Sequence, residues 1–353
     1  MREGHINLYS DTQSRPSSGM RQAMLAAPVG DEQKDLDPSV NALCAHVAGL
    51  LGMETAVFLP SGTMCNEIAM MVHCQPGDEI YADRTAHILN FEAGGPAAFA
   101  GANIFTLDGK NGIYTAEQLA QATRHPMDRY APRSRMISVE QTANLGGGKV
   151  WPLDAIRAVR DAAKERNLKC HMDGARLMNA VVASGVPAKE FTEGFDSAWV
   201  DLSKGLGCPF GGVLAGSRDF IYEAWRCKQR IGGAMRQAGM MAAAGLYAFE
   251  HNVDRLAQDH ANAKRLAEIV NSHPLIEINP DDVETNLLFI DIEKTAVSPY
   301  KIVSELEALG INIGAFGTTL RAVTYLNIDS AQIEEAGEQI LKVINALMDE
   351  QGA

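Results

Sequence analysis

Short apolar runs alternate with amphipathic stretches over the first two thirds of the chain. Strands are predicted where these runs are bounded by polar or glycine-rich turns, at 55–59, 136–140, 168–173, 195–201 and 212–215. Helical periodicity precedes or follows most of them, at about 38–52, after 60–63, at about 153–166 and from Ala175. Strands that alternate with helices predict βαβ units and a mainly parallel sheet covered on both faces.

The pattern changes after about Ala234. It is helical for a long stretch and then predicts a strand near 286–292, a helix near 299–309, a strand near 320–324 and a last helix from Asp329. We therefore expect two domains, a large α/β domain over 1–253 and a small C-terminal α+β domain over 254–353.

Composition limits the classes of partner. A length of 353 residues suits one large and one smaller domain. The formal net charge of −13 argues against nucleic acid or an anionic membrane surface as partner. The six cysteines form no C-x-x-C pair, the histidines show no metal-ligand spacing, and neither a signal peptide nor a membrane span is recognisable. These features predict a cytoplasmic protein without a metal site.

Lys204 is the first candidate for chemistry. It follows an apolar strand and lies in the glycine-rich loop SKGLGCPFGG, where a solubilising charge is out of place. A lysine on a loop is normally a solvated surface residue, so the functional interpretation depends on partners.

Two other features supply such partners. Asp173 lies at the carboxyl end of a predicted strand, and in open α/β sheets ligands bind at the carboxyl ends of the strands. A carboxylate there can hold the pyridine nitrogen of pyridoxal phosphate protonated, although it can also simply cap the next helix. The turn Pro60-Ser61-Gly62-Thr63 lies between a strand and a helix, where backbone N–H groups and hydroxyls suit a phosphate.

With these features in place, the chain resembles the low-specificity L-threonine aldolases of the β-eliminating lyase family, within the fold-type I pyridoxal-phosphate enzymes. The resemblance covers nearly the whole chain, and SKGLG together with DGAR and MRQ carries most of its specificity. The matching stretches are Ser10-Asp11-Thr12, Arg15-Pro16, Val29-Gly30-Asp31, Asp37-Pro38-Ser39-Val40-Asn41, Pro60-Ser61-Gly62-Thr63-Met64, Ala86-His87-Ile88, Glu92-Ala93-Gly94-Gly95, Asp173-Gly174-Ala175-Arg176, Leu202-Ser203-Lys204-Gly205-Leu206-Gly207, Gly232-Gly233, Met235-Arg236-Gln237 and Leu320-Arg321.

The resemblance implies a role for each matched cofactor residue. Lys204 would hold pyridoxal phosphate as a Schiff base, and Asp173 would pair with its pyridine nitrogen. Arg176 would lie near the ring hydroxyl and the substrate, and His87 would stack on the ring face. The segment Ser61–Thr63 would bind the phosphate.

It also implies a substrate site and an assembly. Ser10 and Arg321 would hold the carboxylate of an amino-acid substrate, Arg321 by a two-point hydrogen-bonded contact. Arg236, from a neighbouring subunit, would help to complete the site. The implied assembly is a homodimer or homotetramer with shared sites, and the implied reaction is retro-aldol cleavage of threonine, allo-threonine or a related β-hydroxy amino acid.

The chain departs from the family on the side of the substrate's β-substituent. The family's Glu-Asn-Thr-His-Asn segment reads Glu140-Gln141-Thr142-Ala143-Asn144 here, so its histidine is replaced by Ala143. The family's tyrosine near the mouth of the site is replaced by Lys34 in this chain. An arginine of the family is replaced by Tyr9. We expect the smaller side chain of Ala143 to leave a larger pocket for the β-substituent. Lys34 should favour substrates with an acidic side chain. His87, acting through a water molecule, is the expected base.

Two alternatives remain open at this stage. One is another pyridoxal-phosphate reaction, such as β-elimination, transaldol exchange or cleavage of a bulkier or acidic substrate. The other is a pyridoxal-phosphate-binding protein without turnover, against which the complete set of cofactor residues argues.

Overall fold

The computed structural model describes residues 5–352. They form two compact units, one spanning Pro16–Val253 and the other joining Asp254 onwards to the N-terminal segment that ends at Arg15. The sequence-based division had placed that N-terminal segment in the large domain. It groups with the smaller unit because β1 (Ile6–Asn7) pairs in parallel with β10 (Ile311–Asn312).

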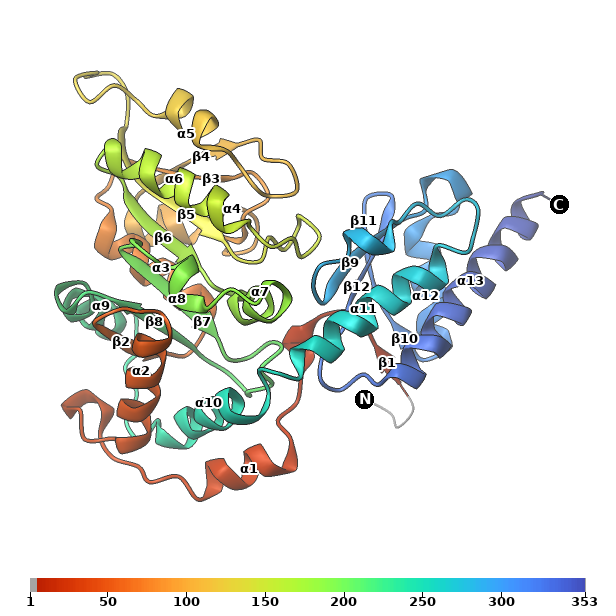
Figure 1. Ribbon diagram of the computed structural model, residues 1–353, viewed down its shortest axis with the longest axis horizontal. Coiled ribbons are helices and arrows are strands. Elements are labelled where there is room, and N and C mark those ends of the chain that lie inside the picture. Colours follow the sequence, from red (N-terminus) through yellow and green to blue (C-terminus); the bar gives the residue numbers. More distant parts are fainter. Residues whose placement is uncertain (1–4, 353) are drawn as a thin grey trace. The chain divides into compact units, whose positions relative to one another are not determined.

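A seven-stranded sheet forms the centre of the larger unit (Figure 1). Its order is β2-β8-β7-β6-β5-β3-β4, and the pairs among β3 to β7 are parallel whereas β8 runs antiparallel to both its neighbours. The predicted mainly parallel sheet is therefore confirmed. The strands are β2 (Thr55–Leu59), β3 (Asp78–Asp83), β4 (Asn103–Leu107), β5 (Arg133–Glu140), β6 (Lys169–Asp173), β7 (Ser197–Asp201) and β8 (Gly212–Gly216).

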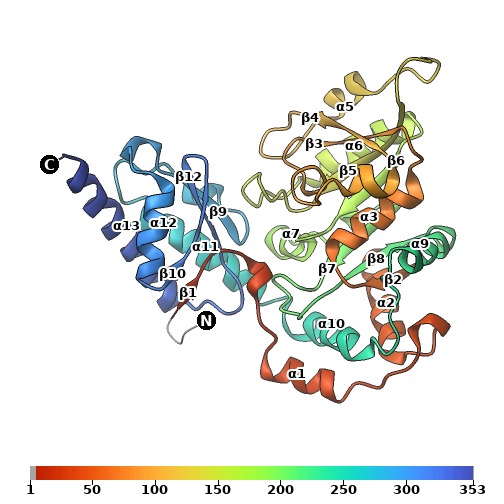
Figure 2. The ribbon, with the colours of Figure 1, turned by 180° about the vertical axis from the view of Figure 1, so that it is seen from behind.

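Helices cover both faces of this sheet. Helix α3 lies on the face seen in Figure 2, and α6 lies on the opposite face, seen in Figure 1. Buried side chains of α3 and α9 pack on β2, β7 and β8 around Trp199. The helices of this unit are α1 (Ser18–Leu25), α2 (Pro38–Leu50), α3 (Gly62–His73), α4 (His87–Asn90), α5 (Ala116–Ala122), α6 (Leu153–Glu165), α7 (Leu177–Ser184), α8 (Ala188–Phe191), α9 (Arg218–Arg230) and α10 (Gly239–His251).

The predicted cap at Asp37 shows how local sequence sets these helices. Its carboxylate accepts hydrogen bonds from the backbone N–H groups of Ser39 and Val40, and Pro38 occupies the first helical position. The same carboxylate accepts from the N–H groups of Gly30 and Gly239 at 3.0 and 2.9 Å. One buried cap therefore also ties two loops to the start of α2.

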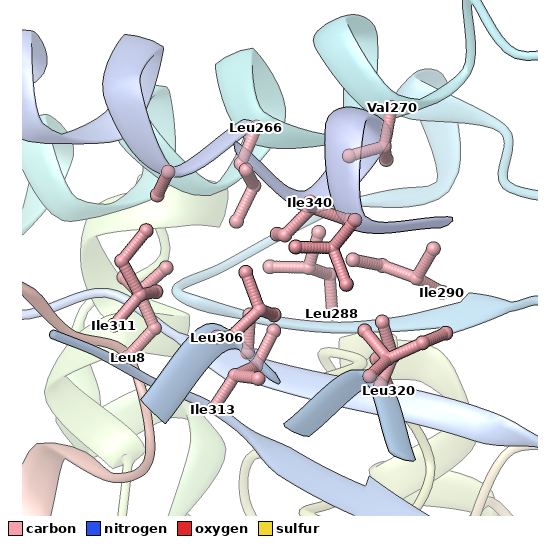
Figure 3. Packing of buried hydrophobic residues seen from close by; sticks show 14 of the residues in the cluster. Leu8, Leu266, Val270, Leu288, Ile290, Leu306, Ile311, Ile313, Leu320 and Ile340 are labelled. Atoms are coloured by element: carbon pink, nitrogen blue, oxygen red, sulfur yellow. The ribbon is translucent and has the colours of Figure 1, made fainter. Parts of the chain in front are cut away.

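The smaller unit is an antiparallel sheet covered by helices. Strands β9 (Leu287–Asp291), β11 (Gly314–Phe316) and β12 (Thr319–Val323) follow the order β11-β12-β9. Helices α11 (Leu256–Val270), α12 (Pro299–Ala308) and α13 (Ser330–Gly352) accompany them. Leucine, isoleucine and valine side chains from these elements pack in one core together with Leu8, Ile311 and Ile313 (Figure 3), and this apolar burial stabilises the unit.

The topology of the larger unit brings several strand ends to one edge. Leu59, at the end of β2, pairs with Gly212, which also pairs with Asp201 at the end of β7. Glu140 and Asp173 end β5 and β6 as register partners. Polar residues that follow these strands are therefore gathered along one edge of the sheet. Among residues 5–352, no helix is both long and apolar enough to cross a membrane.

Candidate active site

Lys204 lies in the loop after β7, and its charge is compensated locally. Its Nζ donates a hydrogen bond of 2.5 Å to Oδ2 of Asp201, the last residue of the strand. Oδ1 of Asp201 accepts from the backbone N–H and the hydroxyl of Ser203 at 2.7 and 2.8 Å. The lysine side chain is 16% exposed, so it is mostly enclosed yet reachable from the edge of the sheet.

Asp173 is held in one orientation by a single asparagine. Its Oδ2 accepts 2.8 Å from Nδ2 of Asn66 on α3, and its Oδ1 accepts 3.0 Å from the N–H of Ala175. Nδ2 of Asn66 also donates to Oε1 of Glu92 at 2.8 Å. Oδ1 of Asn66 accepts from Trp199 Nε1 at 2.8 Å and contacts His171 Nε2 at 3.0 Å. The four contacts use the full hydrogen-bonding capacity of the amide.

A buried chain of neutral groups continues from this asparagine. Burial, reinforced by the charges of nearby basic groups, lowers the pKa of His73 to about 3, and burial likewise lowers the pKa of His171 to about 3. Because Asn66 Oδ1 only accepts, Nε2 of His171 carries the proton, and its Nδ1 accepts from the Ser197 hydroxyl at 2.8 Å. The same hydroxyl oxygen then accepts from Nε2 of His73 at 2.8 Å. Every proton in this chain has an assigned position, which fixes the Asn66 amide.

His87 lies at the start of α4 after β3, half buried and bound to two carboxylates. Its Nδ1 donates to Oε1 of Glu92 at 2.7 Å, and its backbone N–H donates to Oε2 of Glu140 at 2.7 Å. Burial lowers the pKa of His87, but the hydrogen bond to Glu92 and the charges of Asp173, Glu92 and Glu140 raise it more, so the net shift is upward. Burial and the charge of Asp173 raise the pKa of Glu140 to about 7.

The first turn of α3 forms the predicted phosphate-binding segment. Ser61 is the N-cap and accepts from the N–H of Met64, and the next two residues are Gly62 and Thr63. A Cβ on Gly62 would lie 2.2 Å from Cη2 of Trp199, so only glycine allows the helix to begin against this ring. The N–H groups of a first helical turn have no acceptor within the helix and attract anions.

Arg176 follows the end of β6 and is 5% exposed. It is the N-cap of α7, and its backbone N–H donates to the carbonyl oxygen of Gln141 at 3.0 Å. The loops after β5 and β6 are thereby joined. The structure places Arg176 within three residues of Asp173, on the same edge of the sheet.

These residues fit a pyridoxal-phosphate group. Such a group needs an amine, a carboxylate for its ring nitrogen, an anion site and a planar contact for the ring. Lys204, Asp173, the α3 N-terminus and His87 offer these chemistries from neighbouring segments at one end of the sheet. Asp173 is 2% exposed, and its two hydrogen-bond donors stabilise the ionised form that a protonated ring nitrogen requires.

Ser10 and Arg321 lie in the smaller unit. Ser10 is buried, and its Oγ accepts from the backbone N–H and the hydroxyl of Thr12 at 3.2 and 2.8 Å. Arg321 is on β12, and its Nη1 donates to the carbonyl oxygen of Tyr9 at 3.2 Å. Within this unit the structure thus brings the two predicted carboxylate ligands to adjoining segments, as β12 and the N-terminal segment are further joined by the bond from Val323 N to Leu8 O.

Lys34 and Arg236 lie on two loops that a buried ion pair holds together. Lys228 and Glu32 have side chains with 0% exposure, and Lys228 Nζ donates to both Glu32 oxygens at 2.9 Å. The Glu32 N–H donates to the carbonyl oxygen of Arg236, whose guanidinium pairs with Asp31 at 3.1 Å. Lys34 and Arg236 are both exposed on this surface.

The model of the Beta-eliminating lyase family matches residues 7–293 of this chain. The chain belongs to that family. It is 40% identical to the Low specificity L-threonine aldolase of Escherichia coli (strain K12), over 94% of this chain and 96% of that one. It is 39% identical to Low-specificity L-threonine aldolase 1 of Arabidopsis thaliana, over 87% of each chain.

Solved structures share the fold of this family member. A putative L-allo-threonine aldolase from Listeria monocytogenes EGD-E has a TM-score of 0.75 at 21% identity, covering 98% of this chain and 96% of its own. A threonine aldolase from Leishmania major has a TM-score of 0.81 at 16% identity, with coverage of 96% and 99%. The expected family and the aminotransferase-like fold are both confirmed.

Ala143 does not open a larger pocket, contrary to the expectation from its replacement of histidine. It is 2% exposed, and Cβ atoms built on Gly112 and Gly146 would lie 2.7 and 2.9 Å from its own Cβ. The adjoining cavity holds about 10 Å³ and is lined by Glu140 and Trp151 among others. The Ala143 side chain is therefore closely packed against the backbone of both glycines.

The main groups that sequence reasoning left without a role are Asn66, Glu92, Trp199 and Asp201. Glu92 falls within a matched stretch and Asn66 lies two residues beyond one, but no spacing rule connects a helix residue to a strand-end aspartate 107 positions later. Asp201 carried a usable signal, because it precedes Lys204 by three residues at the end of a predicted strand.

Gly62→Ala is expected to destabilise the larger unit by about 1–3 kcal/mol, because the added methyl overlaps the Trp199 ring. It should also weaken pyridoxal-phosphate affinity by displacing the first turn of α3. Gly49→Ala is the matched control, since its Cβ meets nothing within 4 Å in helix α2 and helical alanine is favoured by about 0.5–1 kcal/mol. Urea unfolding and a cofactor titration measure both effects, and equal stability of the two variants would contradict this packing.

Proposed function

We propose that this family member catalyses pyridoxal-phosphate-dependent retro-aldol cleavage of an L-β-hydroxy-α-amino acid to glycine and an aldehyde. The observation that carries the proposal is that an enclosed lysine, Lys204, and a fixed carboxylate, Asp173, follow or end neighbouring strands at one edge of the sheet. The curated relatives named L-threonine aldolases, at about 40% identity over most of the chain, support the same reaction.

Five positions would hold the cofactor. The amine of Lys204 would hold its aldehyde carbon, Asp173 its ring nitrogen, and the Ser61–Thr63 turn its phosphate, while Arg176 would lie near the ring hydroxyl and His87 against the ring face. When bound, pyridoxal phosphate supplies an electron sink for the carbanion left at the substrate α-carbon.

The substrate would be oriented by its carboxylate. We assign this contact to Arg321, because a planar guanidinium can make two parallel hydrogen bonds to a carboxylate, and we assign Ser10 and Arg176 to the same role. Fixing the carboxylate sets which bond of the α-carbon is aligned for cleavage, and this orientation accounts for a large part of the rate of such a step.

A base must take the proton of the β-hydroxyl. We assign this role to His87, acting through a water molecule, because Nδ1 is committed to Glu92 and Nε2 is the remaining ring nitrogen. A base acts in its neutral form, so cleavage should increase as the pH rises through the raised pKa of His87. Lys34 is proposed as a contact for substrates with an acidic side chain.

We further propose a homodimer or homotetramer in the cytoplasm, with Arg236 contributed to a neighbouring subunit's site. The exposed position of Arg236, on a loop held by the buried Lys228–Glu32 pair, supports an intersubunit contact. All six cysteines are free, which is typical of a reducing compartment.

The purified protein is expected to release glycine and acetaldehyde from L-threonine, with phenylserine and β-hydroxyaspartate as competing substrates. Amino-acid analysis together with identification of the aldehyde measures each kcat/KM, and Lys204→Ala serves as the inactive control. Lys34→Met should reduce cleavage of β-hydroxyaspartate alone. Release of no glycine from any of these substrates by a cofactor-loaded protein would exclude the proposed reaction.

Reduction of the cofactor-loaded protein, which should be yellow, with borohydride should link the cofactor to Lys204 and to no other lysine. An ammonium group beside Asp201 and near the fixed Asp173 is the enclosed amine best placed for this bond. Peptide mapping after reduction locates the label, and Lys204→Ala should remain unlabelled while retaining some cofactor through its phosphate contacts. A label on a different lysine would remove Lys204 from the proposal.

Arg321→Lys is expected to weaken substrate binding about ten- to hundredfold, because an ammonium cannot reproduce two parallel bonds worth roughly 1.5–3 kcal/mol each. The absorption spectrum of the bound cofactor should hardly change. Arg265→Lys is the control, as Arg265 is exposed and pairs with Glu334 on the surface of the same unit. Substrate titrations measure the affinity of each variant. Equal affinities of the Arg321→Lys and Arg265→Lys variants would show that Arg321 does not bind the substrate carboxylate.

A further inference from the structure

Glu67 is a buried carboxyl group without a donor for its charge. It lies on α3 next to Asn66, is 2% exposed, and neither of its oxygens has a hydrogen-bond donor among the described residues. Its carboxyl group packs closely against Gly95, where a Cβ would lie 1.8 Å from Oε1. An ionised carboxylate in such a position would lose its hydration without compensation.

The nearest charged partner of Glu67 is Glu92, whose side chain has 0% exposure. Glu92 differs from Glu67 in its donors, because Oε1 accepts from both Asn66 Nδ2 and His87 Nδ1. Its Oε2 receives no donor from the described groups as long as both carboxyl groups are ionised. One proton shared between Glu67 and Glu92 removes the repulsion between two buried negative charges, because the two carboxyl groups then hydrogen-bond to each other.

The position of that proton follows from the donors. Two donated hydrogen bonds stabilise the negative charge on Glu92, whereas Glu67 has none. Burial, followed by the charge of Glu92 and the hydrogen bond to it, raises the pKa of Glu67 to about 9. Glu67 is therefore the group that keeps the proton near neutral pH.

We propose that Glu67 is a neutral carboxylic acid that donates a hydrogen bond to Oε2 of Glu92 and thereby positions the Glu92 carboxylate on His87. Glu67 touches neither substrate nor cofactor in this role and is a positioning residue. The inference rests on the proposed function only for its catalytic consequence, since the protonation of Glu67 is a property of the chain itself.

The consequence concerns the proton on His87. When His87 is neutral, only hydrogen bonds stabilise the negative charge of Glu92, and the proposed hydrogen bond from Glu67 is one of them. The other titratable groups that act on His87 are the acidic side chains of Asp173 on β6 and Glu140 on β5. Loss of the Glu67 hydrogen bond should therefore make Glu92 hold the His87 proton more tightly and raise the pKa of His87.

Infrared difference spectroscopy of the full-length protein tests the protonation state. At about pH 8, between the pKa of about 7 for Glu140 and about 9 for Glu67, the wild type should show a protonated-carboxyl stretch that Glu67→Gln lacks. Glu79→Gln is the matched control, because Glu79 is buried but pairs with Arg124 and should be ionised. A wild-type spectrum equal to that of Glu67→Gln would overturn the proposal.

Unfolding in urea across the pH range gives a second measurement. The pKa of Glu67 is higher in the folded than in the unfolded chain, so its contribution to stability is present at low pH and declines as the pH rises through about 9. Glutamine does not titrate, so Glu67→Gln should gain stability relative to the wild type as the pH increases. A stability difference that is independent of pH would also overturn the proposal.

Histidine NMR of the same proteins tests the positioning role. Glu67→Gln keeps a donor in the side-chain amide and should leave the pKa of His87 unchanged, whereas Glu67→Leu should raise it by about one unit, the effect of one hydrogen bond to a charged group. An unchanged pKa in a folded Glu67→Leu variant would remove the link to His87. The infrared, unfolding and NMR measurements need no substrate. They therefore test the role of Glu67 independently of the proposed aldol cleavage, which is tested by glycine release.

Discussion

The saturated amide of Asn66 is the interaction on which the arrangement of the site depends. It joins α3 to the ends of β6 and β7 and to the segment after α4, because its partners Asp173, Trp199, His171 and Glu92 come from those elements. A buried amide with four satisfied bonds has one orientation, and each partner loses a bond if the amide turns. The Asp173 carboxylate is thus fixed by the helix whose first turn forms the anion site.

This arrangement concentrates acidic groups around few cations. Asp173, Glu92, Glu140 and Asp201 are all at least nine-tenths buried, and Lys204 is the cation that pairs directly with one of them. The site tolerates the excess of negative charge because backbone N–H groups and amide hydrogens are directed at the oxygens. A cofactor with a protonated ring nitrogen would add a positive charge among these carboxylates, so the arrangement of charges in the chain itself favours its binding.

Five of the seven strands of the larger sheet, the cap at Asp37 and the positions of Lys204 and Asp173 at strand ends were predictable from the sequence because their causes are local, whereas β3 and β4 were not predicted. Asp37 caps α2 through neighbouring N–H groups, and Lys204 and Asp173 each follow an apolar strand. Contacts that depend on tertiary structure were not predictable. The strand β8 is an apolar run that gives no sign of its direction, so its antiparallel pairing could not be predicted. The contact of Ala143 with Gly112, 31 residues earlier in the chain, could not be predicted either.

The enclosure of Ala143 also changes how the departure from the family pattern should be understood. Removing a polar side chain enlarges a pocket only if the space stays open, and here Gly112 and Gly146 pack closely against Ala143 beside a cavity of only about 10 Å³. Any adjustment of substrate preference must therefore come from groups that face the cofactor edge or the loop surfaces. The protonation of His87 is set by its neighbours Glu92, Asp173 and Glu140, and through Glu92 this control extends to Glu67 on α3.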